Sequence, residues 1–187
     1  MDKDFLNKYL RDFSELIIPD DLVLNQLVEI KEALVSAHSK GNKGLIFGNG
    51  GSAAIASHFS VDLTKNASVR CLNFNESDLI TCFSNDYGFE NWIAKAVEFY
   101  GDQGDVLIVI SSSGKSKNMI NATTAARAKK FSKIVTLSGF EENNPLRISG
   151  DINLWVNSKA YNFVENLHQI WLLALVDLVI GDREYSA

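Results

Sequence analysis

Cysteine and proline are scarce in this chain of 187 residues, and no long apolar run occurs. The two cysteines, Cys71 and Cys82, lack C-x-x-C spacing, which argues against a cysteine metal site. Both stand in apolar-leaning segments, so we expect buried, reduced thiols. The longest apolar stretch, residues 170–180, contains Asp177 and is too short to span a bilayer. Charges interrupt every apolar run near the N-terminus, so no signal-peptide pattern occurs there, and we expect a soluble cytoplasmic protein without a membrane partner.

Positive charge is also in short supply, because 18 lysines and arginines stand against 23 acidic residues, for a net charge of −5. A general nucleic-acid binder usually carries a basic excess, so no nucleic-acid partner is expected. An anionic ligand is compatible with this charge, since a small site can be locally positive inside an acidic protein. Hydrophobic residues make up 46% of the chain, which is enough for one globular domain over residues 1–187.

The apolar residues of the chain follow two patterns, a helical one in the N-terminal part and a strand–helix alternation in the rest. Helical spacing over residues 5–17 and 21–39 predicts an N-terminal helical extension within residues 1–40. The following core, residues 41–187, has short apolar runs typical of strands: GLIF, VRCLNF, DVLIVIS, KIVTLS and INLWV. Helices are expected near residues 52–65, 76–84, 89–100, 115–130 and 162–180. Such an alternation indicates an α/β fold with a parallel sheet covered on both faces.

Ligands of open α/β sheets bind beyond the carboxyl ends of the strands, and the loop GNGGS follows the first strand. Its three glycines let the backbone approach a ligand closely, and Ser52 can cap a helix whose N-terminal amides favour an anion. A plain strand-to-helix turn is the structural alternative, but one glycine would serve it. The loop matches neither the Rossmann nor the Walker pattern, because GNGGSA fails the last glycine of the first and lacks the G-K-[ST] ending of the second.

Two further loops carry polar groups. ISSSGKS, residues 110–116, follows the strand DVLIVI and offers hydroxyls, a glycine and a lysine at a helix N-terminus, which suits a phosphate. A serine-rich capping turn is its structural alternative. In SNDYGFE, residues 84–90, Asn85 and Asp86 either bind sugar hydroxyls or make a turn before the next helix.

GNGGSAAIASHF and ISSSGKSKNMINA together resemble the SIS (sugar isomerase) domain family, and within it the sedoheptulose-7-phosphate isomerases, also called phosphoheptose isomerases. ND-YGF and E-N-L-H also follow the family's order, so the resemblance covers essentially the whole chain. It implies the SIS fold, a flavodoxin-like three-layer sandwich with a five-stranded parallel sheet after N-terminal helices. It also implies an isomerase that converts a ketose phosphate to an aldose phosphate through an enediol, without a cofactor. The product would feed heptose synthesis for a surface polysaccharide.

The same resemblance implies the substrate contacts. The phosphate would be held by the serines of the second loop, namely Ser111, Ser112, Ser113 and Ser116. The sugar would be lined by the first loop and nearby polar residues, namely Asn49, Gly50, Gly51, Ser52, His58, Asn85 and Asp86.

The proton-transfer groups depart from the family pattern at two positions. Asp62 replaces the family's glutamate base, and Leu173 stands at the family's histidine on the last helix, where leucine cannot move a proton. Glu165 occupies a position where the family usually has a substrate-binding glutamine. His168 lies three residues farther on, on the same helical face. We therefore expect Asp62 as one acid/base, with Glu165 and His168 as a relocated pair. The structural alternatives are a carboxylate that complements the helix dipole and a histidine satisfied by local hydrogen bonds.

Two further expectations concern a metal ion and the oligomeric state. No resident metal is expected. A zinc site of His58, Asp62, Glu165 and His168 is the alternative, but metal ligands scattered over two helices are a weak sequence signal. The resemblance implies a homotetramer or at least a dimer, and a last helix that is apolar nearly all round agrees with burial in the core or between subunits.

The alternative function is a non-catalytic SIS module that binds a sugar phosphate or a protein, as in the member that associates with the bacterial replication initiator. Leu173 favours this alternative, whereas the two intact loops favour the enzyme.

Overall fold

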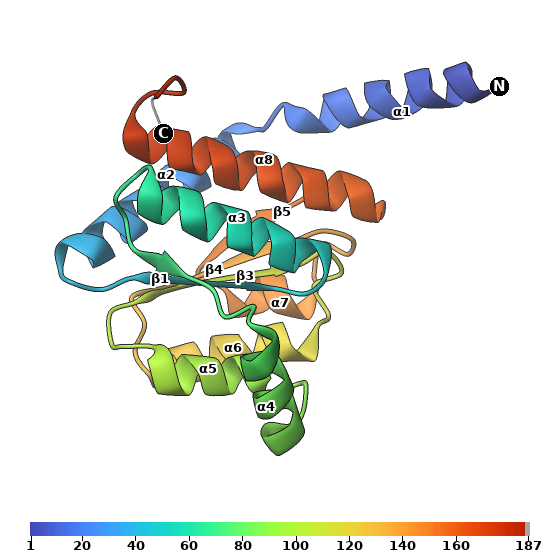
Figure 1. Cartoon of the computed structure of the whole chain (residues 1–187). Helices are drawn as coiled ribbons and strands as arrows, with labels where there is room; N and C mark the ends of the chain where they lie inside the picture. Colours follow the sequence, from blue (N-terminus) through green and yellow to red (C-terminus); the bar gives the residue numbers. More distant parts are fainter. Residues whose placement is uncertain (186–187) are drawn as a thin grey trace.

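Five parallel strands form one sheet in the computed structural model, which describes residues 1–185 (Figure 1). The strands are β1 Gly44–Gly48, β2 Cys71–Leu72, β3 Val106–Ser111, β4 Lys133–Ser138 and β5 Ile152–Trp155. The helices are α1 Asp2–Ile17, α2 Asp21–Ser39, α3 Gly51–Lys65, α4 Ser77–Tyr87, α5 Trp92–Tyr100, α6 Lys117–Ala128, α7 Pro145–Ser149 and α8 Tyr161–Ile180. The strand order is β2-β1-β3-β4-β5, which confirms the predicted five-stranded parallel sheet.

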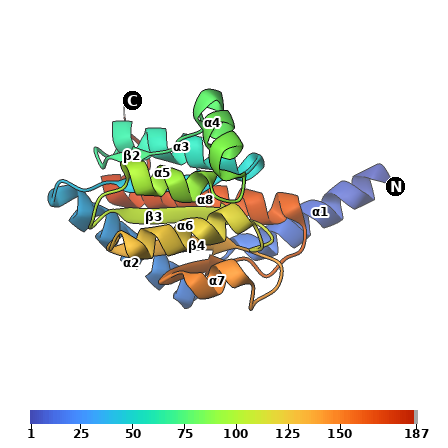
Figure 2. The ribbon, with the colours of Figure 1, turned by 90° about the horizontal axis from the view of Figure 1, so that it is seen from below.

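Helices cover both faces of the sheet and give three layers. α2, α3 and α8 lie on one face, whereas α5, α6 and α7 lie on the other, with α4 beside α5 (Figure 1). Figure 2 looks onto the second face, where α5 and α6 run side by side across the sheet. Because α3 follows β1 on one face and α6 follows β3 on the other, the winding reverses between these two neighbouring strands. This reversal is the place where open α/β sheets bind ligands.

Alternate residues of each central strand point to opposite faces, and both sets are buried. Ile108 and Ile110 of β3 pack with α2, α3 and α8, whereas Leu107 and Val109 pack with α5 and α6. Burial on both faces explains why the strands appear in the sequence as continuous apolar runs rather than as alternating ones.

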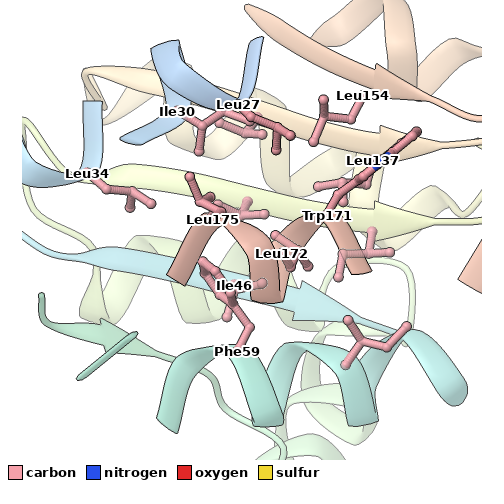
Figure 3. Close-up of a cluster of buried hydrophobic side chains, with 14 of the residues drawn as sticks. Leu27, Ile30, Leu34, Ile46, Phe59, Leu137, Leu154, Trp171, Leu172 and Leu175 are labelled. Carbon is pink, nitrogen blue, oxygen red and sulfur yellow. The ribbon is translucent and has the colours of Figure 1, made fainter. Parts of the chain in front are cut away.

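α8 is the central helix of the first face. Figure 3 shows Leu172 and Leu175 of α8 between Ile30 of α2 and Phe59 of α3, above the sheet. By length and composition alone α8 could cross a membrane. Eight of its residues are buried against the rest of the protein, as expected of a core helix.

α1 projects away from the sheet and has no buried residue (Figure 1). Tyr9 and Phe13 pack on Phe163 of α8, with ring centroids 4.6 and 5.3 Å apart. On the same helix, Phe5 and Leu10 are 68% and 61% exposed. The apolar face predicted for this helix is therefore present, but most of it has no partner within the described part of the chain.

Three local predictions differ from the structure. β2 spans only Cys71 and Leu72 instead of residues 69–74, because it is an edge strand that pairs with β1 alone. The buried Cys71 has a pKa raised to about 12 by burial, whereas Cys82 is exposed on α4, contrary to expectation. The short helix α7 was not predicted, because five residues are too few to show a helical period.

Candidate active site

The two glycine- and serine-rich loops lie side by side at the carboxyl edge of the sheet. β1 and β3 are neighbours in register, with Gly48 opposite Ile110, so both strands end at the same level. The side chains of Asn49 and Asn118 then exchange two hydrogen bonds, of 3.1 and 2.9 Å, between the first loop and α6. The first loop is therefore joined directly to the helix that follows the second loop.

A small polar hollow of about 150 Å³ lies between these loops. Its lining includes Ser52, at the N-terminus of α3, and six other polar residues, namely Asn49, Ser111, Ser112, Ser113, Ser116 and Glu165. Ser111 and Ser116 hydroxyls lie 2.9 Å apart, and Ser116 is the N-cap residue of α6 without using its side chain as a cap. Two helix N-termini and several hydroxyls thus surround a space that suits a phosphate group.

The glycines of the first loop answer two separate steric demands. Gly50 has a φ of +56°, which favours glycine over residues with a Cβ. A Cβ on Gly51 would lie 2.5 Å from a carboxylate oxygen of Glu165. The bare backbone at residue 51 therefore makes room for the Glu165 side chain beside the hollow.

A second, larger hollow of about 360 Å³ lies between α3 and α8. His58 of α3 and Glu165 of α8 both line it, together with Gly51 and Gln169. His58 Nε2 lies 3.1 Å from a carboxylate oxygen of Asp62, one helical turn away. Glu165 borders both hollows, so a carboxylate stands where the phosphate space meets a groove that contains an imidazole–carboxylate pair.

The structure places His168 away from both hollows. Its side chain is fully buried, and Nε2 lies 3.2 Å from the Ser138 carbonyl oxygen, while Nδ1 has no hydrogen-bond partner within residues 1–185. Burial lowers the pKa of His168 to about 4, so the ring is neutral near pH 7. This placement corrects the expectation of a Glu165–His168 acid/base pair, because three residues along α8 turn the histidine toward the sheet.

Asn85 and Asp86 also lie outside these hollows. The sequence predicted a loop at the end of a strand, but α4 continues to Tyr87 and stops only at Gly88, whose φ is +85°. Both side chains are exposed on α4 and hydrogen-bond each other at 2.9 Å. Within one chain they therefore do not join the other predicted substrate residues.

The four side chains that the sequence offers as an alternative zinc set do not come together. Among residues 1–185, no group of three or more histidine, cysteine, aspartate or glutamate side chains is placed to hold a metal ion. His168 points to the Ser138 carbonyl instead of joining His58 and Glu165.

Tyr161 and Gln169 line the hollows but were not singled out from the sequence. Tyr161 is the first residue of α8, which follows the last strand. A helix that follows a parallel strand begins at the carboxyl edge of the sheet, so this position was a signal for Tyr161. Gln169 shares a helical face with Glu165, four residues earlier.

Residues 20–139 match the family described as SIS domain, a span that contains both loops and the first four strands. The chain belongs to the SIS-domain family. This membership agrees with the flavodoxin-like strand order and with the polar hollow at the reversal between β1 and β3.

Similar SIS-domain proteins carry one recurring name. A phosphoheptose isomerase of Yersinia enterocolitica is 33% identical over 168 residues, which cover 87% of this chain and 86% of that protein. A phosphoheptose isomerase of Fusobacterium nucleatum is 29% identical over 181 residues, or 93% and 92% of the two chains. The solved structure of a phosphoheptose isomerase from Francisella tularensis superposes with a TM-score of 0.87 at 27% identity, over 97% of this chain and 100% of that one.

Proposed function

We propose that this SIS-domain protein is a phosphoheptose isomerase, which interconverts sedoheptulose 7-phosphate or a close relative with the aldose phosphate. The observation that carries the proposal is the position of Glu165, between the serine-lined hollow and the groove that contains His58. A carboxylate there lies next to the carbon chain of a sugar whose phosphate occupies the hollow. The near full-length similarity to phosphoheptose isomerases supports the same assignment.

The enediol route needs two positioned proton-transfer groups. One group removes a proton from the hydroxyl-bearing carbon beside the carbonyl while the carbonyl oxygen gains a proton, which gives the enediol. The former carbonyl carbon then gains a proton, and the hydroxyl on the neighbouring carbon loses one to form the new carbonyl. Atoms and electrons balance without a redox cofactor. We assign the two transfers to Glu165 and His58, because both side chains line the groove.

Asp62 acts through His58 in this scheme. Its carboxylate oxygen lies 3.1 Å from His58 Nε2, and it is the less exposed of the pair, with 22% of the side chain accessible against 50% for His58. A proton on Nε2 that is donated to Asp62 leaves Nδ1 as the basic nitrogen for the substrate. The aspartate that replaces the family's glutamate is thus a positioning residue rather than the base itself.

The test is proton NMR of the protein with sedoheptulose 7-phosphate in deuterated water. The wild type should form the aldose and incorporate deuterium beside the carbonyl, and Glu165→Gln and His58→Gln should each slow exchange by about 10²- to 10⁴-fold. Glu29→Gln is the matched control, because Glu29 pairs with Lys133 and lines neither hollow. Substrate line broadening without exchange in the wild type would contradict the isomerase assignment.

That contrary outcome would favour a non-catalytic sugar-phosphate-binding module. Its specific support is Leu173, a half-buried residue that offers no proton where the family has a histidine. Ser113→Ala separates this module from a protein scaffold, since the substitution should weaken sugar-phosphate binding and leave protein association unchanged.

We also propose that the whole chain acts as one SIS domain within a cytoplasmic homo-oligomer, a dimer or tetramer. Two free thiols are in keeping with a reducing compartment. The exposed apolar face of α1 supports association, because burying each large apolar side chain of this face would stabilise an assembly by about 1.5–3 kcal/mol.

A further inference from the structure

The serine loop is the turn of residues 111–116 that follows β3. Asn144 is the most completely buried amide side chain near this loop, with 1% of its surface exposed. It lies between β4 and α7 and lines neither hollow. Its Nδ2 donates to the Ser138 hydroxyl at 3.0 Å and to the Glu141 carbonyl at 2.8 Å, while Oδ1 accepts from the Arg147 backbone N–H at 2.9 Å. One side chain thus fixes the whole turn from β4 to α7.

The β4–α7 turn also hydrogen-bonds to the backbone of the serine loop. The Gly139 N–H donates to the Ser112 carbonyl at 2.9 Å, and the Leu146 N–H donates to the Gly114 carbonyl at 3.0 Å. Both loop carbonyls therefore point toward the β4–α7 turn, which leaves hydroxyls rather than carbonyl oxygens to meet an anion in the hollow.

Asn144 also contacts the serine loop directly. Gly114 has a φ of +65°, and a Cβ at this residue would overlap the Asn144 side chain. The amide is packed against the backbone of the one loop residue whose conformation requires glycine. Gly114 and Asn144 therefore fit each other sterically, and displacement of either frees the loop.

We propose that Asn144 is a positioning residue for phosphate binding, which holds the Ser111–Ser116 loop in the conformation that accepts the anion. The inference rests on the proposed function only in that the serine-lined hollow takes the substrate phosphate. If loss of the amide leaves the loop competent about one-tenth of the time, the Kd for phosphate rises about tenfold.

The experiment measures inorganic phosphate binding by calorimetry and, separately, KM and kcat for sedoheptulose 7-phosphate. Asn144→Ala should raise the Kd for phosphate and the KM about tenfold, with kcat within about threefold of the wild type. Asn153→Ala is the matched control, since Asn153 is a partly buried amide that bonds Thr136 and Gly150 away from the serine loop. It should lower thermal stability and leave phosphate affinity unchanged.

Asn144→Asp serves if the alanine variant does not fold, because it keeps the shape and the α7 cap but loses the donated hydrogen bonds. It too should weaken phosphate binding. Phosphate affinity within twofold of wild type in either folded variant, with a lower melting temperature alone, would overturn the inference, as would a wild type that binds no phosphate. Loss of phosphate binding in Asn144→Ala from a wild type without turnover would instead sustain the inference and refute the isomerase assignment.

Discussion

His168 is held neutral by its surroundings, and this gives the protein a measurable pH dependence. Its pKa is lowered to about 4 by burial, from 6.5 for a free histidine, so the unfolded chain binds a proton that the folded chain does not bind between these values. Stability is therefore expected to fall as the pH drops from 6.5 to 4, by a total of about 3 kcal/mol, and to lose nothing further from this group below pH 4.

His168→Gln isolates this contribution, because glutamine can still donate to the Ser138 carbonyl but does not titrate. Urea unfolding of both proteins should show the advantage of the wild type over the variant shrinking between pH 7 and pH 4. Parallel stability curves over this range would contradict the burial of a neutral ring. Activity is a second readout, since a group that only packs should leave the pH profile of kcat unchanged.

At the scale of elements, the paired amides of Asn49 and Asn118 connect the first loop to α6. Asn118→Asp keeps an acceptor for the Asn49 N–H but removes the donor to the Asn49 carbonyl oxygen. We expect the KM to rise about tenfold, because the half-buried amide oxygen of Asn49 would lose its donor, at a cost of roughly 1 kcal/mol, and Asn49 would be free to turn away.

The matched control for this element is Asn121→Asp on the same helix. Asn121 donates to the Glu90 carbonyl and to Asn91, so it ties α6 to α5 instead of to the first loop. Steady-state kinetics of the two variants should differ in KM. Equal KM values would mean that the Asn49–Asn118 bridge does not orient the site.

At the scale of the whole molecule, the exposed face of α1 predicts self-association. Leu6 and Leu10 are 55% and 61% exposed on a helix that contacts the rest of the chain mainly through Tyr9 and Phe13. Leu6→Asp with Leu10→Asp should reduce the mass measured by light scattering, because two carboxylates would have to be buried at the interface.

A control with the same added charge is Asn7→Asp with Ser14→Asp, at positions outside the apolar stripe. This variant should keep the wild-type mass. A wild type that is a stable monomer at micromolar concentration would refute the assembly proposal outright.

The sequence by itself determined the fold class and the position of the main loops. Doubly buried strands must be continuously apolar and must alternate with helices, so β1, β3 and β4 were predicted nearly residue for residue, as was the edge strand β5. Glycines and serines at strand ends are local signals as well, and parallel topology then brings those ends together. The hollow lined by residues 111–113 and 116 follows from these local rules.

Only the tertiary structure decided which side chains share a space. His168 and Glu165 stand three residues apart on one helix, yet packing of α8 on the sheet buries the first and leaves the second beside Gly51. Asn85 and Asp86 lie outside the site because α4 extends about one turn farther than the sequence predicted. Asn144 before Pro145 was a local signal for a helix start, but its contact with Gly114 depends on where α7 and the serine loop meet. Contacts between distant segments are set by packing, which local patterns do not encode.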